Sequence, residues 1–276
     1  MAVETGNLLG TYLKDRRTRI DPAALGFPVG RRRTPGLRRE EVAQRSNISA
    51  TWYTWLEQGR GGAPSADVLE RIARALMLTD AEREHLFLIG LGRLPEVRYR
   101  RIEGVTPRLQ RMLDALTVSP ALIRTLTWDV VAWNRAAAAV LGDYSRLEPQ
   151  QRNILRLMFL GDSRVRDMQF DFQAVARFVV GAFRADVARA GAQEHVQTLV
   201  DELTRGSPDF AAMWRDNDVA VHGEGVKRLR HPRLGTLELE YSAFGVDGRP
   251  DLTMVVYNPA NAETADKVRK LVKALK

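Results

Sequence analysis

The sequence predicts two domains, an all-α amino-terminal domain followed by an α+β domain with an antiparallel sheet. The chain of 276 residues is about twice as long as a usual single domain. Apolar residues recur at helical spacing through most of residues 6–91. Residues 218–258 instead alternate apolar and polar side chains in runs joined by short turns, which is typical of antiparallel strands. We therefore expect a multi-domain protein with a boundary near residue 100.

Five short helices are expected in the first domain. The hydroxyl of Ser49 can cap the third helix and that of Ser65 the fourth. Thr79 with Glu82 forms a capping box for the fifth. The predicted spans are residues 6–20, 38–46, 49–59, 65–76 and 79–91.

A three-residue turn starting at Asn47 joins the second and third helices. Such a turn usually needs a left-handed backbone, which Asn adopts better than most residues other than Gly. Two helices joined in this way form a helix-turn-helix unit, whose second helix lies in the major groove of DNA. The residues expected to face inward and fix the angle between the helices are Val42, Ala43, Ile48, Tyr53 and Leu56.

The outward face of this unit predicts the contacts with DNA. A Thr side chain can bond a base or contact a thymine methyl, and a Trp offers mainly apolar contact. Arg side chains beside them can bind phosphates, which positions a protein without reading the sequence. The residues expected to meet base edges are Arg39, Ala50, Thr51, Trp52 and Trp55. The residues expected to contact phosphates are Arg31, Arg32, Arg33, Arg38 and Arg60.

The distribution of charge supports an anionic partner for this end of the chain. The net charge is +8, and residues 1–60 hold 11 basic and six acidic side chains, so they carry more than half of it. Helix pairs are common and a run of Arg is usually only a solvated surface. The turn, the inward pattern and the charge together favour double-stranded DNA as the partner, with an affinity that falls steeply with salt.

Composition excludes several other classes. The chain has no Cys, so disulfides, zinc–thiolate sites and a Cys nucleophile are excluded. Its first residues lack the pattern of a signal peptide, and no apolar run reaches the roughly 18 residues of a membrane span. We expect a soluble, cytoplasmic protein with no membrane partner.

Beyond residue 93 the pattern changes. Residues 93–106 are basic and lack apolar periodicity, so they indicate a linker. Further along the chain, Ser207 before Pro208 is expected to cap a helix. The predicted domains are residues 1–95 and 105–276, with a linker at about 96–104. In the second domain we expect strand-like alternation over 121–133, helices through 151–214, strands over 225–231, 234–244 and 252–258, and a last helix over 262–275.

Nearly the whole chain resembles one family. The XRE-type helix-turn-helix domain of the MmyB-like regulators is similar to the segments TPGLRREEVAQRSNIS, YTWLEQGR and PSADVLERIARALMLTDAEREHL. The carboxy-terminal domain of that family is similar to PALIRTLTWDVVAWNRAAAAVLG, LVDELTRGSPDFAAMWRDNDV and KRLRHPRLGTLELEYSAF. Two residues depart from the family pattern, because Trp55 stands where Arg is common and Asn47 replaces the usual Gly.

The resemblance implies a bacterial transcription regulator with a PAS-like domain that holds a small, fatty-acid-like ligand. A pocket for such a molecule needs an apolar lining and a few polar groups, and an Arg suits a carboxylate because its planar fork donates two hydrogen bonds. Most aromatic residues are simply core, and Arg184 could equally tie two helices together. The residues predicted to contact the ligand are Trp128, Asn134, Phe178, Arg184, Phe210, Trp214, His222 and Met254.

Two other classes of function stay open. An enzyme would start from His222 and His231, but none of the four His residues has helical metal-ligand spacing to another, and no phosphate-binding Gly loop is present. We therefore expect no catalytic residue, no metal and no cofactor besides the ligand. A DNA-binding or interaction protein without a ligand would have a second domain with a filled core. Because a palindromic operator presents paired half-sites, we expect a homodimer.

Overall fold

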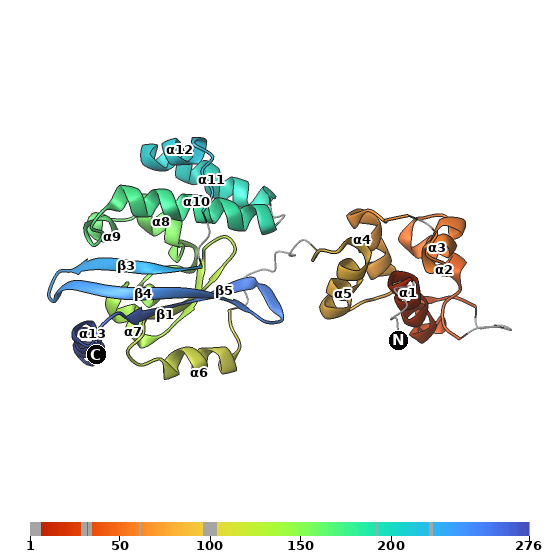
Figure 1. The fold of residues 1–276 in the computed structure, drawn as a ribbon, viewed down its shortest axis with the longest axis horizontal. Helices are drawn as coiled ribbons and strands as arrows, with labels where there is room; N and C mark the ends of the chain where they lie inside the picture. The colour runs from red at the N-terminus through yellow and green to blue at the C-terminus, as the bar shows by residue number, and fades with distance from the viewer. Residues whose placement is uncertain are drawn as a thin grey trace, which may run out of the picture. The chain divides into compact units, whose positions relative to one another are not determined.

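A computed structural model of the chain describes residues 7–28, 32, 35–60, 62–95, 104–190, 193–220 and 223–275. The chain divides into two compact units, Met1–Pro95 and Glu96–Lys276 (Figure 1). The predicted linker falls almost entirely on residues 96–103, which lie outside the described residues, as do Arg31, Arg33 and His222.

The first unit is all-α, as predicted, and begins its helices at the expected caps. Ser49, Ser65 and Thr79 each accept a hydrogen bond from a backbone N–H in the first turn of the helix that follows. The sequence did not predict a short 3-10 helix, η1 (Ala23–Leu25), between the first two helices. The five helices are α1 (Leu8–Arg19), α2 (Arg39–Ser46), α3 (Ala50–Glu57), α4 (Ala66–Ala75) and α5 (Asp80–Leu91).

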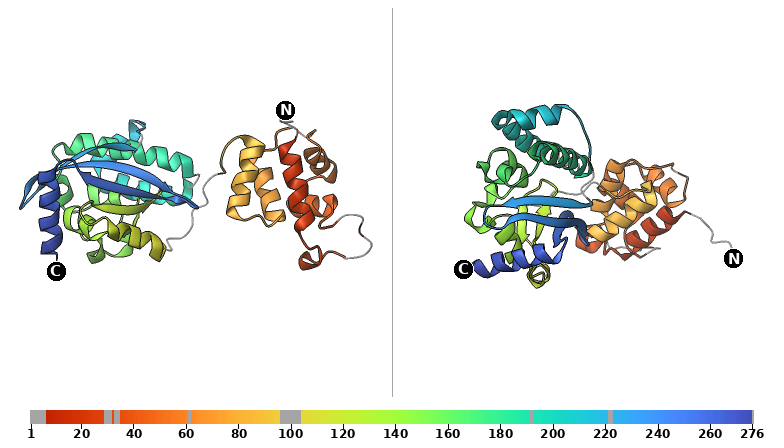
Figure 2. Two further views of the ribbon diagram at one scale, coloured as in Figure 1. Left: turned by 60° about the horizontal axis from the view of Figure 1, so that its bottom comes forward. Right: turned by 60° about the vertical axis from the view of Figure 1, so that its left-hand side comes forward.

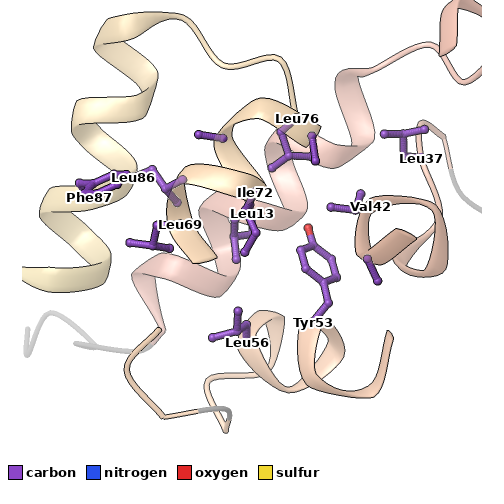
Figure 3. Close-up of a cluster of buried hydrophobic side chains, with 13 residues drawn as sticks. Leu13, Leu37, Val42, Tyr53, Leu56, Leu69, Ile72, Leu76, Leu86 and Phe87 are labelled. Carbon is purple, nitrogen blue, oxygen red and sulfur yellow. The ribbon is translucent and has the colours of Figure 1, made fainter. Parts of the chain in front are cut away.

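One apolar core holds these five helices together. Leu13 of α1 lies at its centre beside Ile72 of α4, and Tyr53 of α3 points toward them (Figure 3). All three side chains are fully buried. Burying a side chain of this size stabilises a fold by about 1.5–3 kcal/mol, so the core fixes the position of α2 and α3.

An antiparallel sheet with helices on it forms the second unit, which confirms the α+β prediction. Its strand order is β2-β1-β5-β4-β3, and all neighbouring strands are antiparallel. Leu237 and Leu239 lie on the same buried face, as their period of two predicts. The strands are β1 (Ala121–Thr125), β2 (Val130–Trp133), β3 (Glu224–His231), β4 (Gly235–Val246) and β5 (Arg249–Pro259).

Helices cover this sheet on both sides. Helices α10, α11 and α12 lie together on one side, and α6 lies on the other (Figures 1 and 2). Three separate apolar clusters result: one between the sheet, α7 and α13, one among α8 and α10–α12, and one under α6. The helices are α6 (Pro107–Ala115), α7 (Arg135–Val140), η2 (Tyr144–Arg146), η3 (Pro149–Gln151), α8 (Ile154–Phe159), α9 (Ser163–Asp167), α10 (Phe172–Ala190), α11 (Gln193–Gly206), α12 (Pro208–Arg215) and α13 (Ala262–Ala274).

Candidate functional site

The turn between α2 and α3 has the predicted geometry. Asn47 adopts the left-handed conformation, with φ 51° and ψ 53°. Its backbone N–H donates to the carbonyl of Gln44 over 3.2 Å, and that of Ile48 to the carbonyl of Ala43 over 3.0 Å. The hydroxyl of Ser49 then accepts a hydrogen bond from the backbone N–H of Trp52 (3.0 Å). These bonds satisfy backbone groups at both helix ends and turn the chain sharply between the helices.

A buried ion pair fixes the far end of α3. Nε of Arg17 donates to Oε1 of Glu57 over 2.6 Å, and Nη1 of Arg17 donates to the carbonyl of Leu37 (2.6 Å). Nε of Arg39 donates to the other carboxylate oxygen, Oε2, over 2.7 Å. Glu57 thus joins α3 to both α1 and the start of α2. Arg39, which the sequence placed among the base contacts, is one of the side chains that hold α3 in place.

The remaining predicted base contacts divide into two groups. Thr51 is exposed, and Trp55, one helical turn further along α3, is 48% exposed. Both therefore lie on the solvent side of α3. Ala50 and Trp52 are half-buried and pack against the core of the first unit. The solvent face of α3 is consequently narrower than the sequence indicated.

Among the predicted phosphate contacts, Arg32 has an internal role. Its guanidinium donates two hydrogen bonds to the carboxylate of Glu41 in α2, over 2.8 and 2.9 Å, and two more to the carbonyl of Pro28. The hydrogen bond from Arg32 lowers the pKa of Glu41. Arg32 therefore links Pro28 to Glu41 of α2, whereas Arg38 and Arg60 are exposed.

The second unit contains an apolar cavity between the sheet and the segment 141–169. Its volume is about 80 Å³. Three strands of the sheet form its floor, and the end of α7, α8 and α9 form its walls. The lining residues are Leu122, Leu141, Tyr144, Ile154, Leu157, Met158, Val165, Met168, Gln169, Lys227, Leu229 and Tyr257.

Lys227 brings a cationic group into this apolar lining. It lies on the inner face of β3, two residues from the buried Leu229, and its Nζ is 5.7 Å from the centre of the Tyr257 ring. Part of the residue stays accessible to solvent, but burial lowers the pKa of its ammonium group to about 8. Among the described residues, no carboxylate lies within ion-pair distance of Lys227.

Two tyrosines bring hydroxyl groups to the same cavity. Tyr144 and Tyr257 are both buried, and burial raises the pKa of each, that of Tyr257 to about 12. Both hydroxyls therefore stay protonated at neutral pH and can donate hydrogen bonds. Lys227, Tyr144 and Tyr257 therefore add three groups that can donate hydrogen bonds to a lining that is otherwise mainly apolar.

A wider hollow adjoins the cavity on the outside. Its volume is about 570 Å³, and it shares Leu141, Tyr144, Leu157 and Val165 with the inner cavity. Apolar residues of α7 and α13 line the hollow, and it is also bordered by the charged residues Asp143, Arg146, Asp162, Arg164 and Arg233. The shared residues make the two spaces neighbours.

None of the predicted ligand contacts that the structure describes lines either space. Trp128, Phe178, Phe210 and Trp214 belong to the cluster among α8 and α10–α12. The rings of Phe210 and Trp214 stack with centroids 5.7 Å apart. Nε1 of Trp128 donates to the carboxylate of Asp186 over 2.9 Å. These aromatic residues form a packed core in this structure.

The other predicted ligand contacts lie apart from the cavity. Met254 belongs to the cluster on the α6 side of the sheet. The amide of Asn134 caps α7, and its nitrogen donates to three backbone carbonyls, so it bonds only to the protein. Arg184 donates to the carbonyl of Trp214 (2.6 Å) and ties α10 to the end of α12, the alternative role considered for it above. His222 lies outside the described residues.

Four residues of the cavity were not predicted from the sequence: Tyr144, Gln169, Lys227 and Tyr257. One signal was present for Lys227, because in the predicted strand 225–231 it shares the alternate positions with Leu229. A cation on the apolar face of a strand is unusual and indicates a function. No comparable local signal marked the other three residues, which reach the cavity through tertiary packing.

Comparison with known proteins identifies both units. Residues 105–271 match the family model of the MmyB-like transcription regulator ligand binding domain, and residues 8–86 match a helix-turn-helix domain. Both families are regulatory domains rather than enzymes. No curated protein matches the chain. Within the part of the chain that the structure describes, no helix is long and apolar enough to cross a membrane, and no cluster of three His, Asp or Glu residues is arranged to hold a metal.

Proposed function

The chain belongs to the MmyB-like transcription regulators and is a DNA-binding regulator with a ligand-binding domain, and we propose that its ligand is a fatty-acid-like carboxylate held by Lys227. In this proposal the second unit is a PAS-like sensor, and the protein acts in the cytoplasm as a homodimer. The observation that carries the proposal is an ammonium group in an apolar cavity with no carboxylate partner among the described residues.

The environment of Lys227 favours an anionic ligand. Removing a charge from water is costly unless the charge is paired, and the lowered pKa of Lys227 reflects that cost. A carboxylate would restore the pairing, and the hydroxyls of Tyr144 and Tyr257 could donate further hydrogen bonds to it. The aliphatic lining around these polar groups suits the chain of a fatty acid.

Volume favours one orientation of such a ligand. Apolar cavities of roughly 150 Å³ bind benzene, so the inner cavity of about 80 Å³ suits a headgroup and the first carbons of a chain. The rest of the chain would pass Leu157 and Val165 into the outer hollow of about 570 Å³. We therefore place the carboxylate inside, at Lys227, and the end of the chain outside.

At the DNA, Thr51 and Trp55 are the side chains best placed to meet base edges. Both lie on the solvent face of α3, which would enter the major groove. Arg38 and Arg60 would bind phosphates, while Arg39 and Arg32 support the unit from within. A ligand in the second unit would regulate DNA affinity. It would do so by binding more tightly to one of two arrangements of the paired helix-turn-helix units than to the other.

Native mass spectrometry of the full chain, purified without detergent, tests the ligand part of this proposal. We expect a retained molecule with the mass of a carboxylic acid, or binding of added dodecanoic acid. A preparation that is empty and does not bind saturated fatty acids of any chain length would contradict it.

A further inference from the structure

Only two side chains of α3 are exposed, and neither carries a charge. Thr51 and Trp55 lie one helical turn apart, so they share one face of the helix. Trp55 is 48% exposed and does not belong to the apolar core of the first unit. The face that α3 presents to a partner therefore consists mainly of the methyl and hydroxyl groups of Thr51 and the indole ring of Trp55.

The other polar side chains of α3 serve the fold. The carboxylate of Glu57 accepts hydrogen bonds from two arginines, one on α1 and one on α2, and is almost completely shielded from solvent. The hydroxyl of Thr54 donates to the backbone carbonyl of Ala50 over 2.8 Å. Tyr53 is fully buried, and Trp52 packs against the core. None of these residues adds a polar group to the exposed face.

The composition of α3 limits which bases it can read. Guanine is commonly read by Arg or Lys, adenine by Asn or Gln, and the amino group of cytosine by Glu or Asp. Helix α3 contains no Arg, Lys, Asn or Gln, and its one acidic residue is the buried Glu57. The readout that remains in the major groove is apolar contact with the C5 methyl group of a pyrimidine.

The nearest amide side chain is that of Gln58, which follows α3. Gln58 caps the carboxy end of the helix and is exposed. In a helix-turn-helix unit, the amino-terminal residues of the second helix contact the base edges. Thr51 lies in the first turn of α3, and Gln58 lies about 10 Å further along the helix axis. Gln58 is therefore the matched control for a test of Trp55.

We propose that α3 reads the C5 methyl group of a pyrimidine, with thymine as the natural base. This inference rests on the proposed function. The indole ring of Trp55 and the methyl group of Thr51 would remove the C5 methyl group from water. The indole N–H can only donate a hydrogen bond, so it suits the O4 acceptor of thymine better than the amino group of 5-methylcytosine.

Substitution of single thymines tests this proposal. Duplexes are first enriched from a random pool on the full chain, and deoxyuridine then replaces one thymidine at a time, which removes only the methyl group. Fluorescence anisotropy should show a loss of about three- to fivefold at one thymine of each half-site, the effect of burying one methyl group. In Trp55→Ala, the duplexes with thymine and uracil at that position should bind equally tightly. Gln58→Ala should keep the difference.

A second comparison identifies the base. Cytosine and 5-methylcytosine, each paired with guanine, replace the thymine at the same position. We expect thymine to bind most tightly, and 5-methylcytosine to bind more tightly than cytosine. If 5-methylcytosine binds more tightly than thymine, the methyl group is still read, but the natural site is a methylated cytosine.

The results that would overturn the proposal are distinct from failure of the proposed function. Equal affinities for thymine and uracil at every position would overturn the proposal while leaving DNA binding intact. A difference that survives in Trp55→Ala would also overturn it, because the methyl group would then act through another residue or through the shape of the DNA. A full chain that binds no duplex at low salt would instead reject the proposed DNA-binding function. Thermal unfolding of Trp55→Ala at the wild-type temperature shows that the variant is folded.

Discussion

Arg17 in α1 and Glu57 in α3 form a buried ion pair, with 2.6 Å between Nε and Oε1. Both side chains are almost completely shielded from solvent. Because Glu57 is the last residue of α3, the pair fixes the direction of the helix that we place in the major groove. In the proposed function, base recognition by Thr51 and Trp55 would therefore depend on this buried pair, which lies beneath the exposed face of α3.

Replacing Glu57 with Ala should destabilise the first unit by about 3–5 kcal/mol, because it leaves the cation of Arg17 buried and unpaired. Hydrogen exchange of the full chain would show faster exchange in α1 and α3. The control Asp15→Ala removes the exposed pair of Asp15 with Arg19 on the same helix and should cost less than about 1 kcal/mol. Unchanged exchange in Glu57→Ala would show that the pair does not hold α3.

Thr51→Ala should weaken binding to the specific operator by about 1–3 kcal/mol and relax the preference at one base position. The hydroxyl is exposed at the start of α3, so folding should be unaffected. Fluorescence anisotropy with operator and mutated duplexes measures both effects. Equal affinity of the variant for its operator would exclude Thr51 from base recognition.

Arg60→Ala should behave differently, because a phosphate contact carries no sequence information. We expect affinity to fall by a similar factor for all sequences, and the slope of log affinity against log salt to decrease by about 1. Lys270→Ala removes one exposed cation from the second unit and serves as the control. A loss restricted to the operator would instead make Arg60 a base contact.

Affinity for dodecanoate should depend on pH through Lys227. Burial places the pKa of this group at about 8, and the carboxylate binds its charged form. The affinity for dodecanoate should therefore be constant below about pH 8 and fall by up to tenfold per pH unit above it. The fall should end at the pKa of Lys227 in the complex, which the bound carboxylate raises. Titration calorimetry from about pH 6.5 to about pH 9.5 measures this, since the carboxylic acid stays ionised throughout.

Lys227→Arg provides the control, because Arg stays charged over this range. The variant should show no such fall with pH. A wild-type affinity that is equally flat would mean that Lys227 does not bind the carboxylate.

Local signals explain why the first unit could be predicted in such detail. The turn at Asn47, the cap at Ser49 and the periodic apolar residues all act within a few positions, so the sequence shows them directly. The roles of Arg39 and Arg32 could not be read in the same way. Each side chain bonds a carboxylate on another segment, Glu57 for Arg39 and Glu41 for Arg32, and only the folded chain brings these groups together.

In the second unit, contacts that depend on tertiary packing were even harder to predict from the sequence. Its strands follow from alternation, but aromatic character does not distinguish a filled core from a pocket. Trp128 and Phe210 pack against their neighbours, whereas the cavity is lined by residues such as Gln169 and Lys227, which lie 58 positions apart in the chain. Asn134 was predicted as a polar contact for the ligand, but its amide instead forms hydrogen bonds with backbone groups of the protein.

The central claim is that a carboxylate at Lys227 regulates DNA binding, and one titration tests it most directly. Operator affinity of the full chain is measured with and without saturating dodecanoate, for the wild-type protein and for Lys227→Met, with Lys270→Met as the control for a lost surface cation. We predict a change of about five- to 150-fold in the wild type and in Lys270→Met, and none in Lys227→Met. An operator affinity that dodecanoate leaves unchanged in the wild type, or changes equally in Lys227→Met, would contradict the claim.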